Sequence, residues 1–439
     1  MIEAALRAID HSPIYHVALV FFAFYPVVTS VMWSSTAATY FFRREYRRPV
    51  APPPLTRFPR VTMLLPCRDE EVHIEETLEA CLRQDYRNLE VVVVDDGSVD
   101  GTVDRVVPFV RAGTVRLVTK ETNEGKAMAI NDALPLITGE IVVVMDADAV
   151  PAPDMVRYLV PHFESPRVAA VTGNPRVADR QEFLAKLQML EFTSIVSILR
   201  RAQRIWGRIL TVSGVVTAFR VSALVDVGLF SPDMATEDID MTWKLQKRYY
   251  DVRYEPGALV WMRVPRSARY LWRQRRRWAL GLVQVLRRHV GDLLHWPRRR
   301  MWPVMVEAIL SILWAYTFVI LTAFWGLSYG LGHPPVGASP IPNWWGMLIA
   351  TLSLVQLGTG VLLDRQYDRD IVKYFPFAVF YPIVYWIFMA IITVISTPAG
   401  LFGKRERGPT RWNIPRQPGR SPEPSAERMD LQPERRASP

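Results

Sequence analysis

Two strongly apolar regions, one near each end of the chain, restrict the folds that this sequence can adopt. Residues 15–42 form a 28-residue run in which His16 is the only side chain that ionises near neutral pH, and about 20 apolar residues suffice to cross the ~30 Å hydrocarbon core of a bilayer. Three further apolar segments follow at 301–330, 343–363 and 374–398. The sequence therefore predicts a multi-pass membrane protein that contacts the lipid bilayer, with a short segment, 1–14, before the first span.

The charges beside these spans predict their orientation. A basic cluster, Arg43, Arg44, Arg47 and Arg48, directly follows the first span, and basic residues concentrate on the cytoplasmic side of membranes. A cleavable signal peptide would carry its positive charge before a shorter apolar core. We therefore expect residues 43–300 to face the cytoplasm.

The topology of the last apolar segment stays open. The loop 331–343 has no Lys, Arg, Asp or Glu, as suits the outside, and residues 364–373 are charged, as suits the inside. A third C-terminal crossing would place the basic "GKRERGPTRW" outside, against the positive-inside rule. Either the segment is re-entrant or interfacial, or the charge count does not apply. The remaining tail, 403–439, is rich in Pro, Arg, Ser and Glu and is predicted to be disordered.

The middle of the chain, 43–262, has the composition of a water-exposed domain. Short apolar runs at 60–70, 89–98, 114–120 and 139–149 alternate with helix-like stretches such as 73–84. Nearly continuous Val and Ile runs between helices are typical of parallel strands buried on both faces. The sequence thus predicts an α/β, doubly wound, mostly parallel sheet.

Acidic residues follow two of the predicted strands, where such sheets bind their ligands. Asp146 and Asp148 stand two positions apart after "VVVM", and carboxylates so placed hold a hard divalent cation while diphosphate oxygens complete its coordination. Asp95 and Asp96 lie where they can accept hydrogen bonds from a nucleoside, and Lys126 opens a predicted helix where a phosphate can bind. The alternatives are ordinary turn chemistry for the acids and a solvated surface lysine.

A third acidic cluster lies in "MATEDIDMTW", where Glu237, Asp238 and Asp240 occupy four positions. One interpretation is purely structural, because Thr236 is a good N-cap and acids suit the first turn of a helix. The other is that the cluster carries chemistry. The local pattern does not decide between them.

Residues 263–300 are strongly basic, with twelve arginines against one acid, Asp292. The pattern in 270–289 predicts an amphipathic helix in the plane of anionic headgroups. Membrane electrostatics explains most of these arginines, and no nucleic-acid partner is expected. Membrane electrostatics does not explain why Gln274 and Trp278 stand among these arginines.

The motifs "DDGS", "DAD", "TED" and "QRRRW", in this order and flanked by membrane segments, resemble the processive family-2 glycosyltransferases, which include cellulose, chitin and hyaluronan synthases. Further segments, among them "VTGNPR", "TVSGV", "TEDIDMTWKLQ" and "YEPGALVW", are similar to the bacterial poly-β-1,6-N-acetylglucosamine synthases of biofilm polysaccharide. The similarity covers about residues 20–410. It implies a GT-A type nucleotide-sugar-binding domain at a bacterial inner membrane, which polymerises N-acetylglucosamine from UDP-N-acetylglucosamine and couples synthesis to export.

The resemblance also implies roles for the donor site. Asp96, together with Asp95, contacts the uridine, while Asp146 and Asp148 hold Mg²⁺ or Mn²⁺ on the diphosphate. Gln274 and Arg277 of the Q-x-x-R-W motif, with Lys126, belong to nucleotide-sugar binding, and Arg277 steadies the diphosphate.

On the acceptor side, the resemblance implies that Asp238 is the general base of an inverting transfer that forms a β-linkage. Trp278 stacks under the acceptor sugar at the channel entrance. Glu237 is a supporting charge, and Ser213 and Gly214 of "TVSGV" are placed with the acceptor.

Two departures from the resembling enzymes stand out. They typically have two N-terminal spans where this chain has one, which points to a small membrane partner, and they read "RWAQGG" where this chain has "RWALGL", so Leu280 replaces a glutamine beside the acceptor site. Glu307 either lines the polymer path or reaches the interface. The rival interpretations are a synthase of another β-linked polymer (chitin-, hyaluronan- or cellulose-like), a transferase acting on a lipid carrier, and a non-enzymatic membrane scaffold or transporter.

Overall fold

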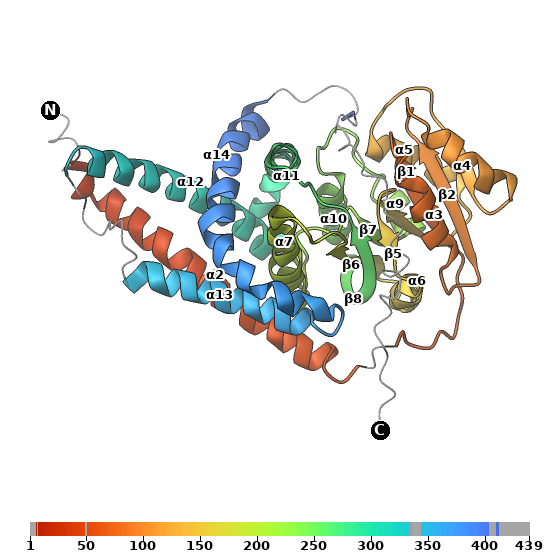
Figure 1. Cartoon of the computed structure of the whole chain (residues 1–439), viewed down its shortest axis with the longest axis horizontal. Helices are drawn as coiled ribbons and strands as arrows, with labels where there is room; N and C mark the ends of the chain where they lie inside the picture. Colours follow the sequence, from red (N-terminus) through yellow and green to blue (C-terminus); the bar gives the residue numbers. More distant parts are fainter. Residues whose placement is uncertain are drawn as a thin grey trace.

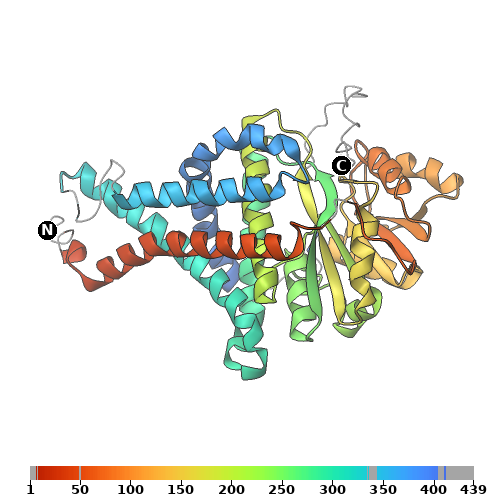
Figure 2. The same cartoon turned by 90° about the horizontal axis from the view of Figure 1, so that it is seen from below.

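The computed structural model describes residues 6, 8–48, 51–333, 335, 344–403, 410 and 411. Most of the predicted disordered tail, 403–439, and much of the loop 331–343 lie outside the described residues. The described part divides into an α/β domain and a group of long apolar helices that extends from one side of it (Figures 1 and 2).

Eight strands form one sheet in the order β3-β2-β1-β4-β7-β6-β8-β5. Their bounds are β1 Val61–Cys67, β2 Leu89–Asp95, β3 Arg116–Thr119, β4 Ile141–Met145, β5 Val150–Pro151, β6 Val168–Val177, β7 Val216–Arg220 and β8 Asp251–Met262. β1, β2, β3 and β4 run parallel, as do β6 and β8, whereas β7 is antiparallel to both of its neighbours and β5 to β8. The predicted mostly parallel α/β sheet is confirmed.

Both faces of the sheet are covered, which explains the continuous apolar runs in the sequence. Along β1, Met63 and Leu65 pack into a cluster with helices α3 (Ile74–Leu82) and α6 (Met155–Leu159). Leu64 packs into a second cluster on the opposite face with helices α5 (Lys126–Ala133) and α10 (Glu237–Lys247). Every residue of β1 and β4 is buried. Alternating side chains thus enter two cores, so neither face of these strands needs polar residues.

The helices between and after the strands have the following bounds: α2 Pro13–Arg44, α3 Ile74–Leu82, α4 Thr102–Arg111, α5 Lys126–Ala133, α6 Met155–Leu159, α7 Phe183–Leu190, α8 Ser197–Trp206, α9 Val221–Asp226, α10 Glu237–Lys247, α11 Ala268–His289, α12 Trp302–Gly330, α13 Trp344–Asp364 and α14 Trp386–Phe402. Two π-helical stretches are η3 Glu191–Val196 and η7 Tyr381–Tyr385, and the 3₁₀ helices are η1 Leu134–Leu136, η2 Val160–Glu164, η4 Val290–Leu294, η5 Trp296–Met301 and η6 Arg369–Val379.

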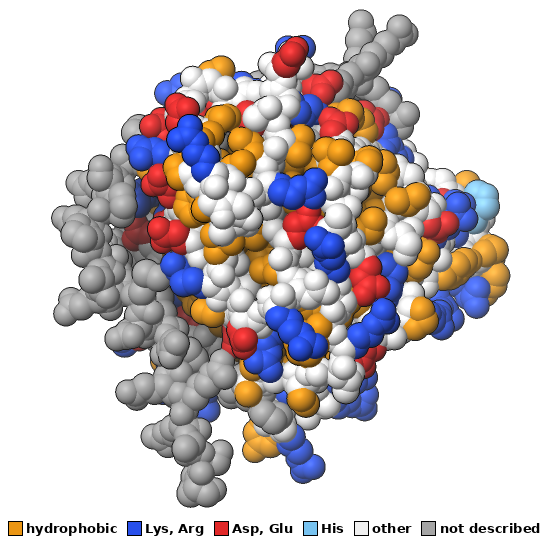
Figure 3. Space-filling model, turned by 90° about the vertical axis from the view of Figure 1, so that its right-hand side faces the viewer, with side chains coloured by type: hydrophobic (Ala, Val, Ile, Leu, Met, Phe, Trp, Pro, Cys, Tyr) orange, Lys and Arg blue, Asp and Glu red, His pale blue; other side chains and the backbone are white. Residues whose placement is uncertain are grey.

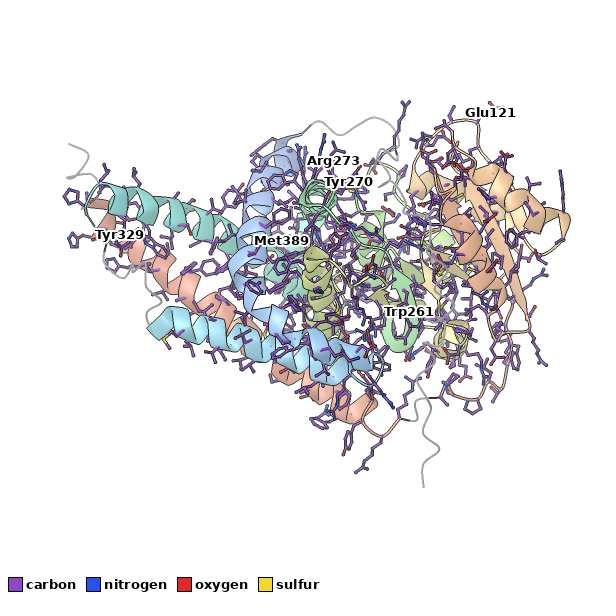
Figure 4. All side chains as sticks on the ribbon, in the orientation of Figure 1. Glu121, Trp261, Tyr270, Arg273, Tyr329 and Met389 are labelled. Carbon is purple, nitrogen blue, oxygen red and sulfur yellow. The ribbon has the colours of Figure 1, made fainter. Side chains whose placement is uncertain are left out.

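Three helices are long and apolar enough to cross a membrane: Pro13–Arg44, Trp296–Gly330 and Gly346–Asp364. They correspond to the first three predicted spans and project together from the α/β domain (Figure 1). Tyr329, near the end of α12, and Glu121, in the α/β domain, mark opposite ends of the molecule (Figure 4). The face of the α/β domain opposite the spans carries interspersed acidic and basic side chains (Figure 3), as expected for a surface in water.

The fourth apolar segment differs from the other three. After η6 and η7, helix α14 has only 17 residues and runs across the direction of α12 and α13 (Figure 1). It packs against α11 and α12.

Candidate active site

The antiparallel direction of β7 places its preceding loop at the edge where β1, β2 and β4 end. Asp146, directly after β4, donates its backbone N–H to the carbonyl of Val215, 3.0 Å away. Gly214 therefore lies beside the acidic strand ends, although it is 68 positions further along the chain than Asp146. β7 begins only at Val216, because the residues before it form this loop.

Lys126 joins three parts of this edge. Its Nζ lies 2.5 Å from Asp146 Oδ1, donates to the Gly214 carbonyl at 2.8 Å and lies 3.9 Å from Glu237 Oε1. Burial alone would lower the pKa of Lys126, but the neighbouring Asp146, Glu237 and Asp238 carboxylates outweigh burial and raise it. Lys126 is thus a charged lysine held inside an acidic cluster, and not a solvated surface lysine.

Asp238 sits on the other side of the same cluster, in the first turn of α10. Its Oδ1 accepts the N–H of Ile239 at 2.9 Å, and a Cβ built on Gly214 would lie only 3.2 Å from Asp238 Oδ2. Burial, followed by the Glu237 charge, raises the pKa of Asp238 to about 6, against the opposing effects of Lys126 and Arg277. A carboxylate with this pKa is largely ionised at neutral pH and can accept a proton.

Asp146 and Asp148 are both half-buried, so neither side chain points fully into the core. Among the described residues, no group of three or more His, Cys, Asp or Glu side chains is placed to hold a metal ion. Two carboxylates at a strand end nevertheless fit a cation that takes its other ligands from substrate phosphates. The residues present therefore suit a divalent cation that binds together with a diphosphate.

Asp95 and Asp96 shape the loops at this edge. Asp96 is fully buried, and its two oxygens accept the N–H groups of Glu124 (3.0 Å) and Gly125 (2.7 Å), which hold the start of α5. Burial raises the pKa of Asp96 despite these bonds. Asp95 accepts hydrogen bonds from the N–H and hydroxyl of Ser98. Asp95 also accepts from the Cys67 thiol at 3.9 Å. The two Ser98 contacts are those of a turn, the alternative weighed from sequence.

Asp240 does not belong to the cluster. Its carboxylate is fully buried, accepts from the Ser231 hydroxyl at 2.6 Å and lies 2.9 Å from Nε2 of His289 on α11. Despite burial, the hydrogen bonds from His289 and Ser231 lower the pKa of Asp240. Asp240 therefore joins α10 to α11. Thr236 stands at the N-cap position, as the structural interpretation predicted, but its hydroxyl makes no capping bond.

The Q-x-x-R-W residues lie on α11 and approach the start of α10. Arg277 donates to the carbonyl of Ala235 at 2.8 Å and is close enough to Asp238 to lower its pKa. Trp278 makes an edge-to-face contact with Phe192, with ring centroids 6.4 Å apart. Gln274 is half-buried on the same helix.

Ser213 shapes the loop before β7, and its hydroxyl is engaged within that loop. It is buried, its N–H donates to the Thr172 hydroxyl at 2.7 Å and its own hydroxyl accepts from the N–H of Val215 at 3.3 Å. Of Ser213 and Gly214, only Gly214 directly contacts the cluster formed by Lys126, Asp146, Glu237 and Asp238, which is called the Lys126–Asp238 cluster below.

Sequence reasoning missed a buried polar group behind Trp278. Arg275 is almost fully buried, forms an ion pair with Glu191 of the π-helical stretch η3, and stacks over the Trp278 ring at 4.1 Å. The hydroxyl of Tyr385 donates to the same Glu191 carboxylate at 2.7 Å. The arginine run concealed this residue, because its pattern alone does not distinguish a buried arginine from one at the membrane surface.

Comparison with known proteins agrees with this geometry. A family model described as "Glycosyltransferase like family 2" matches residues 59–281, which contain the sheet, the Lys126–Asp238 cluster and the Q-x-x-R-W residues. The chain belongs to the family-2 glycosyltransferases. The family resemblance inferred from the motifs is confirmed.

Relatives of this glycosyltransferase match over nearly its whole length. The poly-beta-1,6-N-acetyl-D-glucosamine synthase of Staphylococcus epidermidis is 32% identical over 417 residues, covering 90% of this chain and 99% of that protein. The synthase of the same name from Staphylococcus aureus (strain COL) is 33% identical over 402 residues, covering 90% and 97%.

Among solved structures, the glycosyltransferase resembles the mannosyltransferase PcManGT from Pyrobaculum calidifontis, which was solved with GDP-Man and Mn²⁺. The TM-score is 0.60 at 27% identity, and the match covers 87% of this chain and 99% of that one. The predicted GT-A fold is confirmed.

Proposed function

We propose that this glycosyltransferase polymerises N-acetylglucosamine from UDP-N-acetylglucosamine into a β-1,6-linked exopolysaccharide of a biofilm matrix. The main support is Asp238, a half-buried carboxylate with a raised pKa that lies against Gly214, whose carbonyl accepts from Lys126. Relatives named as synthases of this polymer, similar over 90% of the chain, support the choice of substrate.

The proposed chemistry is a single displacement. Asp238 removes the proton from the attacking hydroxyl of the acceptor sugar, while UDP leaves from the opposite face of the anomeric carbon. One displacement inverts an α-linked donor into a β-linkage and requires one base without a carboxylate nucleophile. Glu237, beside Asp238, raises the pKa of that base and so keeps it able to hold the proton.

Lys126 and Arg277 are the cations of the donor site. We assign the diphosphate to the space between them, because both lie close enough to Asp238 to lower its pKa. Asp96 and Asp95 shape the loop that would receive the uridine. Asp146 and Asp148 would hold Mg²⁺ or Mn²⁺, which would neutralise charge on the departing diphosphate. Lys126 must then share or release its contact with Asp146 Oδ1.

The acceptor is assigned to the side of α11 and the apolar helices. Trp278, held by Phe192 and Arg275, would stack against the acceptor sugar, with Gln274 on the same helix. We place the α/β domain in the cytoplasm at a bacterial inner membrane and propose that the growing chain leaves along the apolar helices, with a small membrane partner completing the path. Polar groups at that depth are tolerated where they line such a path.

The experiment is UDP release from membranes that contain the full chain, measured with a panel of UDP-sugars and Mg²⁺ or Mn²⁺. We expect release with UDP-N-acetylglucosamine alone, loss of at least a hundredfold in Asp238→Asn, and loss on chelation of the metal. Asp104→Asn, which changes an exposed acid on α4, is the matched control and should keep full activity.

The outcomes test the assignment of the donor sugar and that of the catalytic base separately. Preference for another donor would overturn the polymer but keep the base, whereas an active Asp238→Asn would overturn the base. Nuclear magnetic resonance of the product then tests the β-1,6 linkage against chitin-, hyaluronan- or cellulose-like polymers. Binding of UDP-sugars without turnover, with and without the partner, would favour a non-enzymatic role.

A further inference from the structure

A basic cavity lies on the side of the α/β domain next to the apolar helices, and no part of the proposed catalytic cycle uses it. It has a volume of about 320 Å³, and four arginines line it together with two tyrosines: Arg167, Arg208, Arg253, Arg300, Tyr249 and Tyr250. A water molecule occupies about 30 Å³ in the liquid, so the cavity has room for a group much larger than one water.

The positive charge of this cavity is poorly compensated. Asp251 is the only acid among the described residues that line it, and it already pairs with Arg253 and Arg204 at 2.7 Å each. The buried Nε of Arg208 has no hydrogen-bond partner among the described residues. Burial lowers the pKa of Arg208, and the charges of Arg300, Arg204 and Arg167 lower it further. The site therefore favours an anion that accepts several hydrogen bonds, as phosphate does.

Two of these arginines, Arg208 and Arg300, also border a second, much smaller pocket of about 10 Å³. Its other lining residues are Trp33 of α2, Gln203 and Trp206 of α8, and Pro303, Val304 and Glu307 of α12. Trp33 and Trp206 pack against each other, with ring centroids 5.5 Å apart. The basic cavity thus shares two lining arginines with a pocket formed by the candidate spans α2 and α12.

Exposed apolar side chains place this region at the membrane surface. Trp206 is 44% exposed, Leu294 89% and Trp296 65%. Tryptophan is enriched where a membrane meets water, and arginine favours the headgroups beside it. A ligand with a charged headgroup and an apolar chain would contact both the arginine-lined cavity and these exposed apolar side chains. A free anion would contact only the arginines.

We propose that the cavity binds the phosphate of an anionic phospholipid, whose acyl chains lie in the bilayer beside the exposed Trp206, Leu294 and Trp296. Tyr249, one of the two tyrosines that line the cavity, is held in place because its hydroxyl donates to the Pro297 carbonyl at 3.3 Å. This hydrogen bond joins the turn before β8 to η5. The bound lipid would tie the α/β domain to the membrane surface. This proposal does not depend on the sugar or polymer assigned above.

The test is native mass spectrometry of the full chain in detergent, titrated with phosphatidylglycerol or phosphatidylcholine. We expect one phosphatidylglycerol to bind in preference. Because each basic residue near an anionic surface contributes about fivefold, the double variant Arg208→Gln/Arg300→Gln should bind about thirtyfold more weakly. Arg299→Gln is the matched control, since Arg299 is adjacent in sequence but stacks on Trp296 at 4.8 Å and is not among the arginines that line the cavity.

Equal retention of phosphatidylglycerol by the wild type and the double variant would overturn the proposal, as would an equal loss in Arg299→Gln. If the double variant does not fold, Arg167→Gln and Arg300→Gln change exposed residues and should each weaken binding about fivefold. A parallel titration with inorganic phosphate distinguishes binding of a lipid phosphate from binding of free phosphate. Binding of free phosphate without any preference for phosphatidylglycerol would overturn the lipid assignment.

Discussion

Lys126 Nζ lies 2.5 Å from Asp146 Oδ1, although 20 residues separate the two in sequence. The same ammonium group donates to the Gly214 carbonyl at 2.8 Å. One half-buried cation therefore connects the start of α5, the end of β4 and the loop before β7, and its charge acts on Asp146, Glu237 and Asp238.

Removing this cation should change the pH dependence of the enzyme. Lys126 lowers the pKa of Asp238, so Lys126→Met should move the acid limb of the pH–rate profile upward by about one pH unit and reduce activity at pH 7. Lys126→Arg should keep most of the wild-type limb. The measurement is kcat/KM for the donor between pH 5 and 8, and an unmoved acid limb in Lys126→Met would contradict the prediction.

The wild-type pH profile should itself report Asp238. The raised pKa of about 6 means that the base is ionised above this value and protonated below it. Activity should therefore be level near pH 7.5 and fall about tenfold for each pH unit below 6. A profile that stays level to pH 4.5, measured at saturating metal, would show that another group accepts the proton.

Asp240 should affect stability and not chemistry. Because His289 and Ser231 lower its pKa in the folded state, Asp240 stabilises the fold above the unfolded value of about 3.9, and this contribution is lost as the pH falls through the folded value. Asp240→Asn should reduce the free energy of unfolding at pH 7 by about 2–4 kcal/mol. A double-mutant cycle with His289→Ala, followed by thermal unfolding, should show strong non-additivity, and additive effects would exclude the contact.

Substituting two neighbouring arginines within the Q-x-x-R-W motif should change the free energy of unfolding by very different amounts. Arg275→Met leaves Glu191 buried without its partner and should destabilise the protein by about 3–5 kcal/mol. Arg276 is exposed, so Arg276→Met should change the free energy of unfolding by less than about 0.5 kcal/mol. Chemical denaturation of both variants measures the difference, and similar values would mean that Arg275 is not buried in an ion pair.

Close packing of α11 on the start of α10 requires a glycine. A Cβ at Gly281 would lie far inside the van der Waals distance of Thr236, so Gly281→Ala should displace α11, cost about 1–3 kcal/mol and reduce activity. At Gly291 a Cβ meets nothing within 4 Å, which makes Gly291→Ala the matched control. Wild-type activity and stability in Gly281→Ala would show that the two helices are further apart.

The sequence by itself determined the architecture and the kind of chemistry. Apolar run length distinguished the spans from the α/β domain, and continuous Val runs such as 91–94 predicted strands covered on both faces, because burial depends on residue type and periodicity. The order of the motifs predicted a family-2 glycosyltransferase. None of these inferences required knowing which side chains meet.

Tertiary structure decided what each charged residue does. Successive helical residues point about 100° apart, so Asp238 faces Gly214 and Lys126, whereas Asp240 faces His289. Within the arginine run, Arg275 is buried against Glu191 and Arg276 is exposed. The helical period predicts that successive side chains point in different directions. Only the packing of α10 and α11 against other elements decides which of these side chains reach solvent, an ion pair or the cluster around Asp238.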